Sequence, residues 1–347
     1  MSRLLSVVVA LGVALAVPMA AGAHSGETGG TDYQTTMTTV PAGIDVRVIG
    51  GDDRLEVRRT TAREVVILGY GKEPYLRLDA QGTWENRNSP AVALNDERYT
   101  SDPVPETATK LGPDWVQTST GDSVIFHDHR SHWMGSQPPV DVRGEPGTTR
   151  TLYDWAVPMV IDESPVELQG TVVWVGTPAS WLWWLLSAVL VIGALLVGLL
   201  TRLPVTALAI AGTVAAVLAS VVTGSSQELD VPGGGTGALI ALAIGGGALA
   251  AALLVGHRLR AVPAHATTVL LMVALVFGAL QLVGLASTAF TYGLVPGPLP
   301  TLVTRLFVLL GLAGVGLVAG ACARAWRDVL AELPAAAPPK APKAPTW

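Results

Sequence analysis

The chain has little charge and almost no cysteine. Of its 347 residues, 14% are charged and one, Cys322, is a cysteine, so disulfides cannot hold any of its domains together. The net charge is −5 at pH 7 and no basic patch is present, which argues against a nucleic-acid partner. The chain also lacks G-x-S-x-G, H-E-x-x-H and a phosphate-binding glycine loop. The enzyme classes that these motifs mark are therefore not indicated.

The N-terminus has the pattern of a secretory signal. Arg3 gives a positive start, residues 4–18 form an apolar run, and Ala-Gly-Ala ends at Ala23. Such a run is too short for a permanent span, and the small residues suit signal peptidase. The pattern predicts a signal peptide over residues 1–23, which makes His24 the first residue of the mature chain.

The second half of the chain is rich in long apolar runs. Five of them can cross about 30 Å of hydrocarbon as helices. They lie near 181–200, 203–223, 236–256, 266–289 and 300–322. Arg305 is the only charged residue within them, so the sequence predicts five transmembrane helices over residues 180–323.

Basic residues occur only in alternate connections of this predicted domain. One side holds Arg202, Arg258, Arg260, Arg324, Arg327, Lys340 and Lys343, whereas loops 224–235 and 290–299 hold no Lys or Arg. The positive-inside rule then places residues 24–179 outside the cell membrane and the C-terminus in the cytoplasm. Residues 324–347 are rich in Pro and Ala, which predicts a disordered tail.

Residues 24–179 contain short runs in which apolar and polar residues nearly alternate. Gly, Asp and Pro separate the runs, as in antiparallel sandwiches and barrels. The runs are GIDVRVIGG, RLEVRR, EVVILGY, PYLRLD, DSVIFHDH, TLYDWAVPMV and VELQGTVVWVG. We expect an extracytoplasmic, immunoglobulin-like β-sandwich, with a long surface excursion over 80–114 and no long helix before Ser180.

Three of the six histidines fall in one stretch, FHDHRSHWMG. If the strand continues through it, His127 and His129 point to the same face. His132 and Met134 follow closely and could reach the same point. Imidazole suits copper and zinc outside the cell, and a thioether favours copper(I). The alternative is a purely structural network, in which Asp128 pairs with Arg130.

A terminal histidine strengthens the copper interpretation, because its amine and ring can chelate one ion together. With the export signal, His24 and the downstream Asp and His residues, the sequence resembles the copper-resistance C (CopC-like) family of exported copper-binding β-sandwiches, some of which are fused to membrane domains. The resemblance implies a copper site from His24, Asp128 and either His129 or His127. The stretches VVILGYGKEPYLRL and FHDHRSHWMG also resemble uncharacterised membrane-anchored ectodomains of high-GC Gram-positive bacteria.

These features favour a membrane-anchored copper-binding protein that works with another membrane or exported copper-handling protein. The alternative from another class is a non-catalytic interaction or assembly protein with a structural histidine cluster. A copper transporter ranks lower, because the spans lack aligned Met or His residues. A copper mono-oxygenase would also use His24, but the sequence does not indicate the flat aromatic surface that binds carbohydrate in such enzymes. No catalytic residue is therefore assigned.

Overall fold

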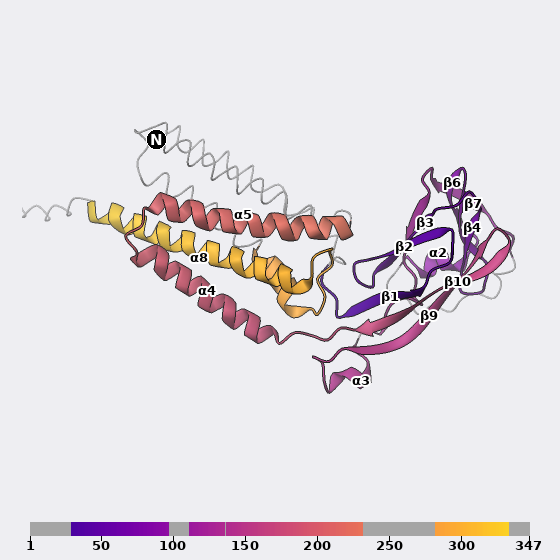
Figure 1. Cartoon of the computed structure of the whole chain (residues 1–347), viewed down its shortest axis with the longest axis horizontal. Coiled ribbons are helices and arrows are strands. Elements are labelled where there is room, and N and C mark those ends of the chain that lie inside the picture. Colours follow the sequence, from indigo (N-terminus) through magenta and orange to yellow (C-terminus); the bar gives the residue numbers. More distant parts are fainter. Residues whose placement is uncertain (1–28, 97–110, 136, 232–281, 333–347) are drawn as a thin grey trace, which may run out of the picture. The chain divides into compact units, whose positions relative to one another are not determined.

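The computed structural model describes residues 29–96, 111–135, 137–231 and 282–332 (Figure 1). The expected signal peptide, His24 and the last residues of the tail lie outside them. The described strands are β1 (Tyr33–Thr39), β2 (Ile44–Ile49), β3 (Arg54–Arg59), β4 (Val65–Leu68), β5 (Pro74–Asp79), β6 (Gly82–Asn86), β7 (Trp115–Ser119), β8 (Ser123–Phe126), β9 (Arg150–Ile161) and β10 (Ser164–Trp174). The described helices are α2 (Pro90–Leu94), α3 (Val140–Arg143), α4 (Ser180–Leu200), α5 (Val205–Asp230), the apolar segment Leu282–Thr291 and α8 (Thr301–Glu332).

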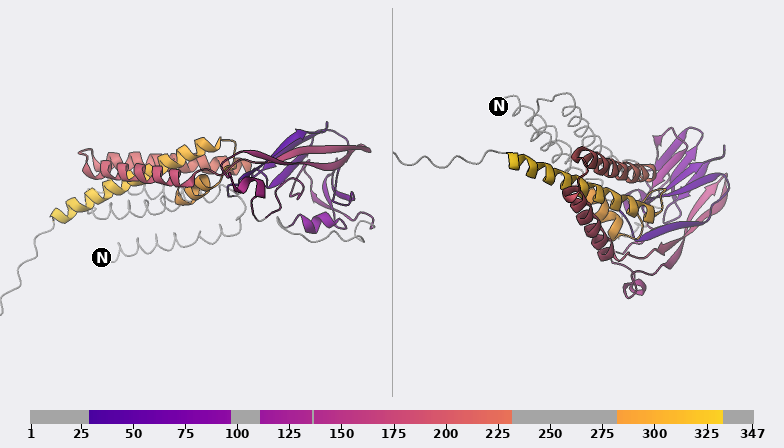
Figure 2. Two further views of the ribbon diagram at one scale, coloured as in Figure 1. Left: turned by 90° about the horizontal axis from the view of Figure 1, so that it is seen from below. Right: turned by 60° about the vertical axis from the view of Figure 1, so that its left-hand side comes forward.

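The strands form two antiparallel sheets. One has seven strands in the order β1-β10-β9-β4-β5-β6-β7, and the other has three in the order β2-β3-β8. Both contribute to a single hydrophobic core, in which Leu55 and Val57 of β3 cluster with Ile67 of β4 and Leu168 of β10. Figure 2 shows the strands, coloured indigo to magenta, from two further directions. The expectation of an antiparallel β region is confirmed.

The β9–β10 hairpin shows how the sequence pattern produces this region. From Trp155 to Ile161, every second residue of β9 is buried, and β10 alternates in the same way. Side chains of successive strand residues point to opposite faces, so the alternating apolar residues enter the core. Asp162 and Glu163 connect the strands with φ of 51° and 65°. Two positive φ angles are what a two-residue hairpin turn of the favoured hand requires.

Two details of the expected β region are wrong. β8 ends at Phe126, so the histidines lie beyond the strand and not on one of its faces. The segment 80–114 is not one surface excursion, because it contains β6 and α2 as well as residues outside the described part. Ser89 caps α2 by accepting a hydrogen bond from the Ala91 amide at 3.2 Å. Pro90 is buried at the first turn, which its fixed φ suits.

Three described helices are long and apolar enough to cross a membrane: α4, α5 and α8. They match the expected spans at 181–200, 203–223 and 300–322. The expected span 236–256 and most of 266–289 lie outside the described residues. α8 continues to Glu332, so residues 324–332 are helical and do not belong to the tail as expected.

The chain divides into two compact units. In its described part, the first unit contains the β region, the last turns of α5 and residues 284–308, which include the connection before α8. The second unit contains most of α4 and α5 and the rest of α8. In the second unit, Gly316 and Gly320 of α8 lie against the backbone of Val191 and Leu195 of α4, where a Cβ atom would clash. Small residues of this kind let membrane helices approach closely.

Candidate metal centre

The histidine segment follows β8 directly and turns back on itself. Phe126 pairs with Leu55 of β3, and the chain then leaves the sheet. The Ser131 amide donates to the Asp128 carbonyl at 3.0 Å, and the Ser131 hydroxyl donates to the same oxygen at 2.9 Å. The resulting turn brings residues on both of its sides close together in space.

Three histidines meet at this turn. One ring nitrogen from each of His127, His129 and His132 lies within 4.8 Å of the others. The ring centroids of His127 and His132 are 4.2 Å apart, and His129 lies 5.4 Å and 5.5 Å from them. Nitrogen ligands of a tetrahedral ion are about 3.3 Å apart, because each metal–nitrogen bond is about 2.0–2.1 Å. Small rotations of the rings would therefore close the cluster around one ion.

Main-chain carbonyls orient two of the rings. His127 Nδ1 lies 2.6 Å from the Asp53 carbonyl oxygen, and His132 Nδ1 lies 3.1 Å from that of Trp133. A carbonyl only accepts, so each contact requires the hydrogen on Nδ1 and leaves the lone pair on Nε2. Both Nε2 atoms are buried. In many metal sites a backbone oxygen fixes one nitrogen of a histidine ring, and the other nitrogen binds the metal; here Nδ1 and Nε2 would have these two roles.

The carboxylate of Asp128 is paired with Arg130. Its buried carboxylate receives Arg130 Nε at 2.8 Å and Nη2 at 2.7 Å, so both oxygens are occupied by one guanidinium. Burial alone would lower the pKa of Arg130, but its hydrogen bond with Asp128 and the attraction between their charges outweigh that effect and raise the pKa. The Asp128–Arg130 pairing that the sequence left open is therefore present. Among the His, Cys, Asp and Glu side chains of the described residues, those close enough together to hold one ion are the three histidines, and Asp128 does not join them.

Hydroxyl groups from three other strands or loops hold the backbone of the segment. Tyr70 accepts from the His129 amide at 3.0 Å, Thr35 donates to the Ser131 carbonyl, and Tyr153 donates to the His132 carbonyl. Burial, helped by the charge of Asp52, raises the pKa of Tyr153 to about 12, so it stays a donor at neutral pH. These contacts fix the backbone that carries the three imidazoles.

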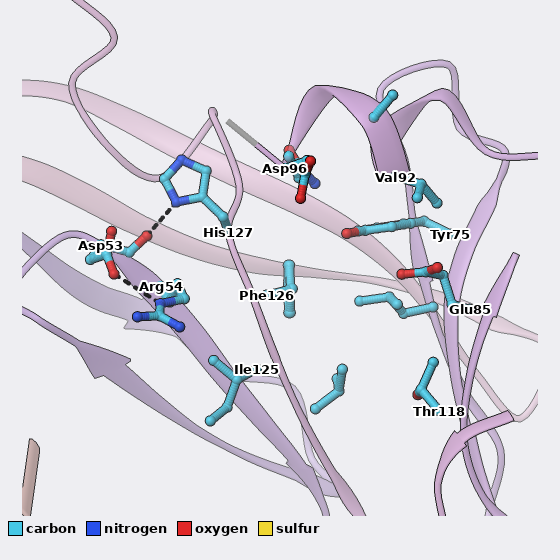
Figure 3. A pocket seen from close by; sticks show the side chains of 14 residues that line it. Asp53, Arg54, Tyr75, Glu85, Val92, Asp96, Thr118, Ile125, Phe126 and His127 are labelled. Carbon is cyan, nitrogen blue, oxygen red and sulfur yellow. Dashed lines mark hydrogen bonds and ion pairs between the residues drawn. The ribbon is translucent and has the colours of Figure 1, made fainter. Parts of the chain in front are cut away.

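A cavity of about 670 Å³ borders His127 (Figure 3). Its lining includes the carboxylates of Asp53, Glu85 and Asp96 and a single basic side chain, Arg54. Arg54 Nε donates to the Asp53 carboxylate at 2.8 Å. The excess of acidic groups favours cations over anions near the histidines.

The sequence identified the three histidines but not the groups that position them. Met134 is partly buried and lies two residues after His132. Asp53, Tyr70 and Tyr153 carried no recognisable pattern, because each reaches the site through strand pairing and not through sequence spacing.

Comparison with protein-family models, with curated proteins and with solved structures gave no match.

Proposed function

We propose that this protein is a membrane-anchored, extracytoplasmic copper-binding protein that takes part in copper handling. The observation that carries the proposal is the meeting of three histidine ring nitrogens within 4.8 Å of one another. Neutral imidazoles bind copper(II) tightly, and zinc is the second candidate because it accepts the same ligands. The copper-resistance C resemblance supports copper over zinc.

The rest of the architecture belongs to the same proposal. A signal peptide ending at Ala23 exports an immunoglobulin-like domain, and five helices anchor it with the C-terminus in the cytoplasm. The three membrane-capable helices of the described residues support the anchor. Cleavage would give His24 a free α-amine, which must lose its proton to bind metal. His24 then completes the copper site that the cluster begins.

A structural role for the histidines is the competing function, in an interaction or assembly protein. It is favoured by one observation: the Asp128–Arg130 pair and the three hydroxyl contacts already hold the segment together. Under that alternative, the imidazoles only fill the turn.

Copper titration of the full-length protein in detergent separates the two functions. We expect one Cu(II) per chain, and loss of that binding when His127 and His129 are both changed to alanine. His265→Ala is the matched control, since it removes a histidine from elsewhere in the chain and should bind as the native protein does. An absence of copper binding by the native protein would leave the structural role.

The contribution of His24 depends on its free α-amine and is tested by removing the amine from this residue. One alanine inserted before His24 keeps every side chain but removes the terminal chelate, so Cu(II) affinity should fall by about tenfold or more. Mass spectrometry confirms the N-terminus in both proteins. Equal affinities would remove His24 from the site and leave the three-histidine cluster.

A further inference from the structure

The connection between β2 and β3 touches both the histidine site and residues adjoining the membrane-capable helices. It consists of Gly50, Gly51, Asp52 and Asp53, here called the Gly50–Asp53 turn. Gly50 and Gly51 have φ of +70° and +83°, which favours glycine at both positions. The Asp53 amide donates to the Ile49 carbonyl at 3.1 Å and closes the turn.

Asp53, the last residue of the turn, holds a ring of the histidine site. The Asp53 carbonyl oxygen is 2.6 Å from His127 Nδ1, so the position of Asp53 fixes one ring of the cluster. Asp53 is buried, and Arg54 binds its carboxylate at 2.8 Å. A shift of His127 that keeps its hydrogen bond to the Asp53 carbonyl therefore moves the turn as well.

Gly50, the first residue of the turn, is hydrogen-bonded to α5. Gly50 donates its amide hydrogen to the Asp230 carboxylate, with a nitrogen–oxygen distance of 3.0 Å. Arg47, on β2, donates to the Leu229 carbonyl at 3.1 Å. Residues that are 180 positions apart in the sequence are thus joined by a hydrogen bond.

The middle of the turn rests on the connection that precedes α8. A Cβ atom on Gly51 would lie 2.6 Å from Leu294 Cδ2 and 2.8 Å from Thr31 Cγ2, so a side chain at this position would have to displace both of these neighbours. The Thr31 hydroxyl donates to the Asp52 carboxylate at 3.0 Å. Thr31 and Leu294 also exchange two backbone hydrogen bonds, of 3.0 and 2.8 Å.

We propose that the Gly50–Asp53 turn couples metal occupancy of the three-histidine site to the end of α5 and to the connection before α8. The inference rests on the proposed function and adds regulation to it. Closing the rings from within 4.8 Å to the roughly 3.3 Å that an ion requires moves His127, and Asp53 carries that movement into the turn. The protein would then sense metal outside the membrane and report it to its helices, instead of only storing the ion.

Coupling of this kind is reciprocal, so the end of α5 must also set the metal affinity. Asp230→Ala removes the acceptor for the Gly50 amide and leaves every histidine in place. In the full-length protein in lipid nanodiscs, we expect Cu(II) affinity to fall by about fivefold or more, the lower end of common coupling strengths. Asp45→Ala is the matched control: it removes an exposed carboxylate from the opposite end of the same hairpin and should change nothing.

The effect of the metal on the turn can be measured in the native protein. Backbone hydrogen exchange is compared in the native protein with and without Zn(II), which avoids copper's redox chemistry. The ion should slow exchange in peptides that contain residues 49–53 and 292–294. His129→Ala, which removes a ligand but no contact of the turn, should abolish the effect.

The outcomes separate the two proposals. Normal metal binding by the native protein, together with unchanged affinity in Asp230→Ala and unchanged exchange in these peptides, would overturn the coupling and leave the metal site intact. Failure of the native protein to bind Cu(II) or Zn(II) would overturn the proposed function, and the coupling with it.

Discussion

The carbonyl oxygen of Asp53 lies 2.6 Å from Nδ1 of His127, although 74 residues separate them in the sequence. This contact gives His127 a defined tautomer and directs its Nε2 lone pair away from the backbone. It also makes the geometry of the histidine cluster depend on the β2–β3 hairpin.

His132 should matter as much as the other two histidines. His132 is fully buried, and its ring nitrogen lies in the cluster with those of His127 and His129. His132→Ala should therefore lower Cu(II) affinity by at least about tenfold, as His127→Ala does. Titrations of both variants at one pH, with circular dichroism as the check on folding, decide this. A His132 variant that binds like the native protein would remove His132 from the ligand set.

Asp128 should act through stability and not as a ligand. Asp128→Ala leaves the guanidinium of Arg130, whose side chain is only 20% exposed, without its carboxylate. Breaking a buried pair from one side costs about 3 kcal/mol in the free energy of unfolding. Denaturant unfolding of the detergent-solubilised protein measures this loss. Asp45→Ala breaks an exposed pair with Arg58 and should be nearly neutral.

A double variant tests whether Asp128 is a metal ligand as well as a partner of Arg130. Replacing both partners, as Asp128→Leu with Arg130→Met, should recover most of the stability, because no charge stays buried. The double variant should still bind Cu(II) through the three histidines. Loss of copper binding in a stably folded double variant would return Asp128 to the ligand set.

Much of the architecture could be predicted from the sequence, because the relevant signals are local. Alternation of apolar residues identified β9 and β10, and uninterrupted apolar runs identified α4, α5 and α8. The histidines were found because they lie within six residues of one another. Their supports were not found, since Tyr70 and Tyr153 reach the segment only after the sheets pair. The expected alternation of His127 and His129 failed for a related reason: β8 ends before them.

Asp32 should make stability depend on pH. Burial raises the pKa of its carboxyl above the usual 3.8, despite a hydrogen bond from the Gly293 amide that lowers it. The folded state thus holds the proton to a higher pH than the unfolded state does. This contribution to stability is present below pH 3.8 and is lost as the pH rises through the folded-state pKa.

Asp32→Asn keeps an acceptor for the Gly293 amide but cannot ionise. The variant should equal or exceed the native protein in thermal stability at pH 7, and this difference should shrink towards pH 4. Melting temperatures of the two proteins across that range provide the test. A variant that is less stable at pH 7 would show that the charge of Asp32 is favourable.

Arg305 should not tolerate lysine. A charged residue near the end of a span can simply reach the interface, but Arg305 donates to the carbonyls of Ala289 and Tyr292 at 2.7 and 2.8 Å. Its guanidinium also lies 5.3 Å from the ring centre of Trp183. Lysine cannot reproduce this fork, so Arg305→Lys should lose about 1.5 kcal/mol of stability. Thermal unfolding in detergent measures it; an unchanged melting temperature would support the interfacial role.

The central claim is that His127, His129 and His132 hold one metal ion. Electron paramagnetic resonance of the full-length protein loaded with one equivalent of Cu(II) tests it most directly, because each bound imidazole nitrogen splits the signal. The account predicts a single species with imidazole nitrogens in its coordination shell, and one fewer of them in His129→Ala. A spectrum of copper bound only through oxygen, or one that is identical in the native protein and in His129→Ala, would contradict it.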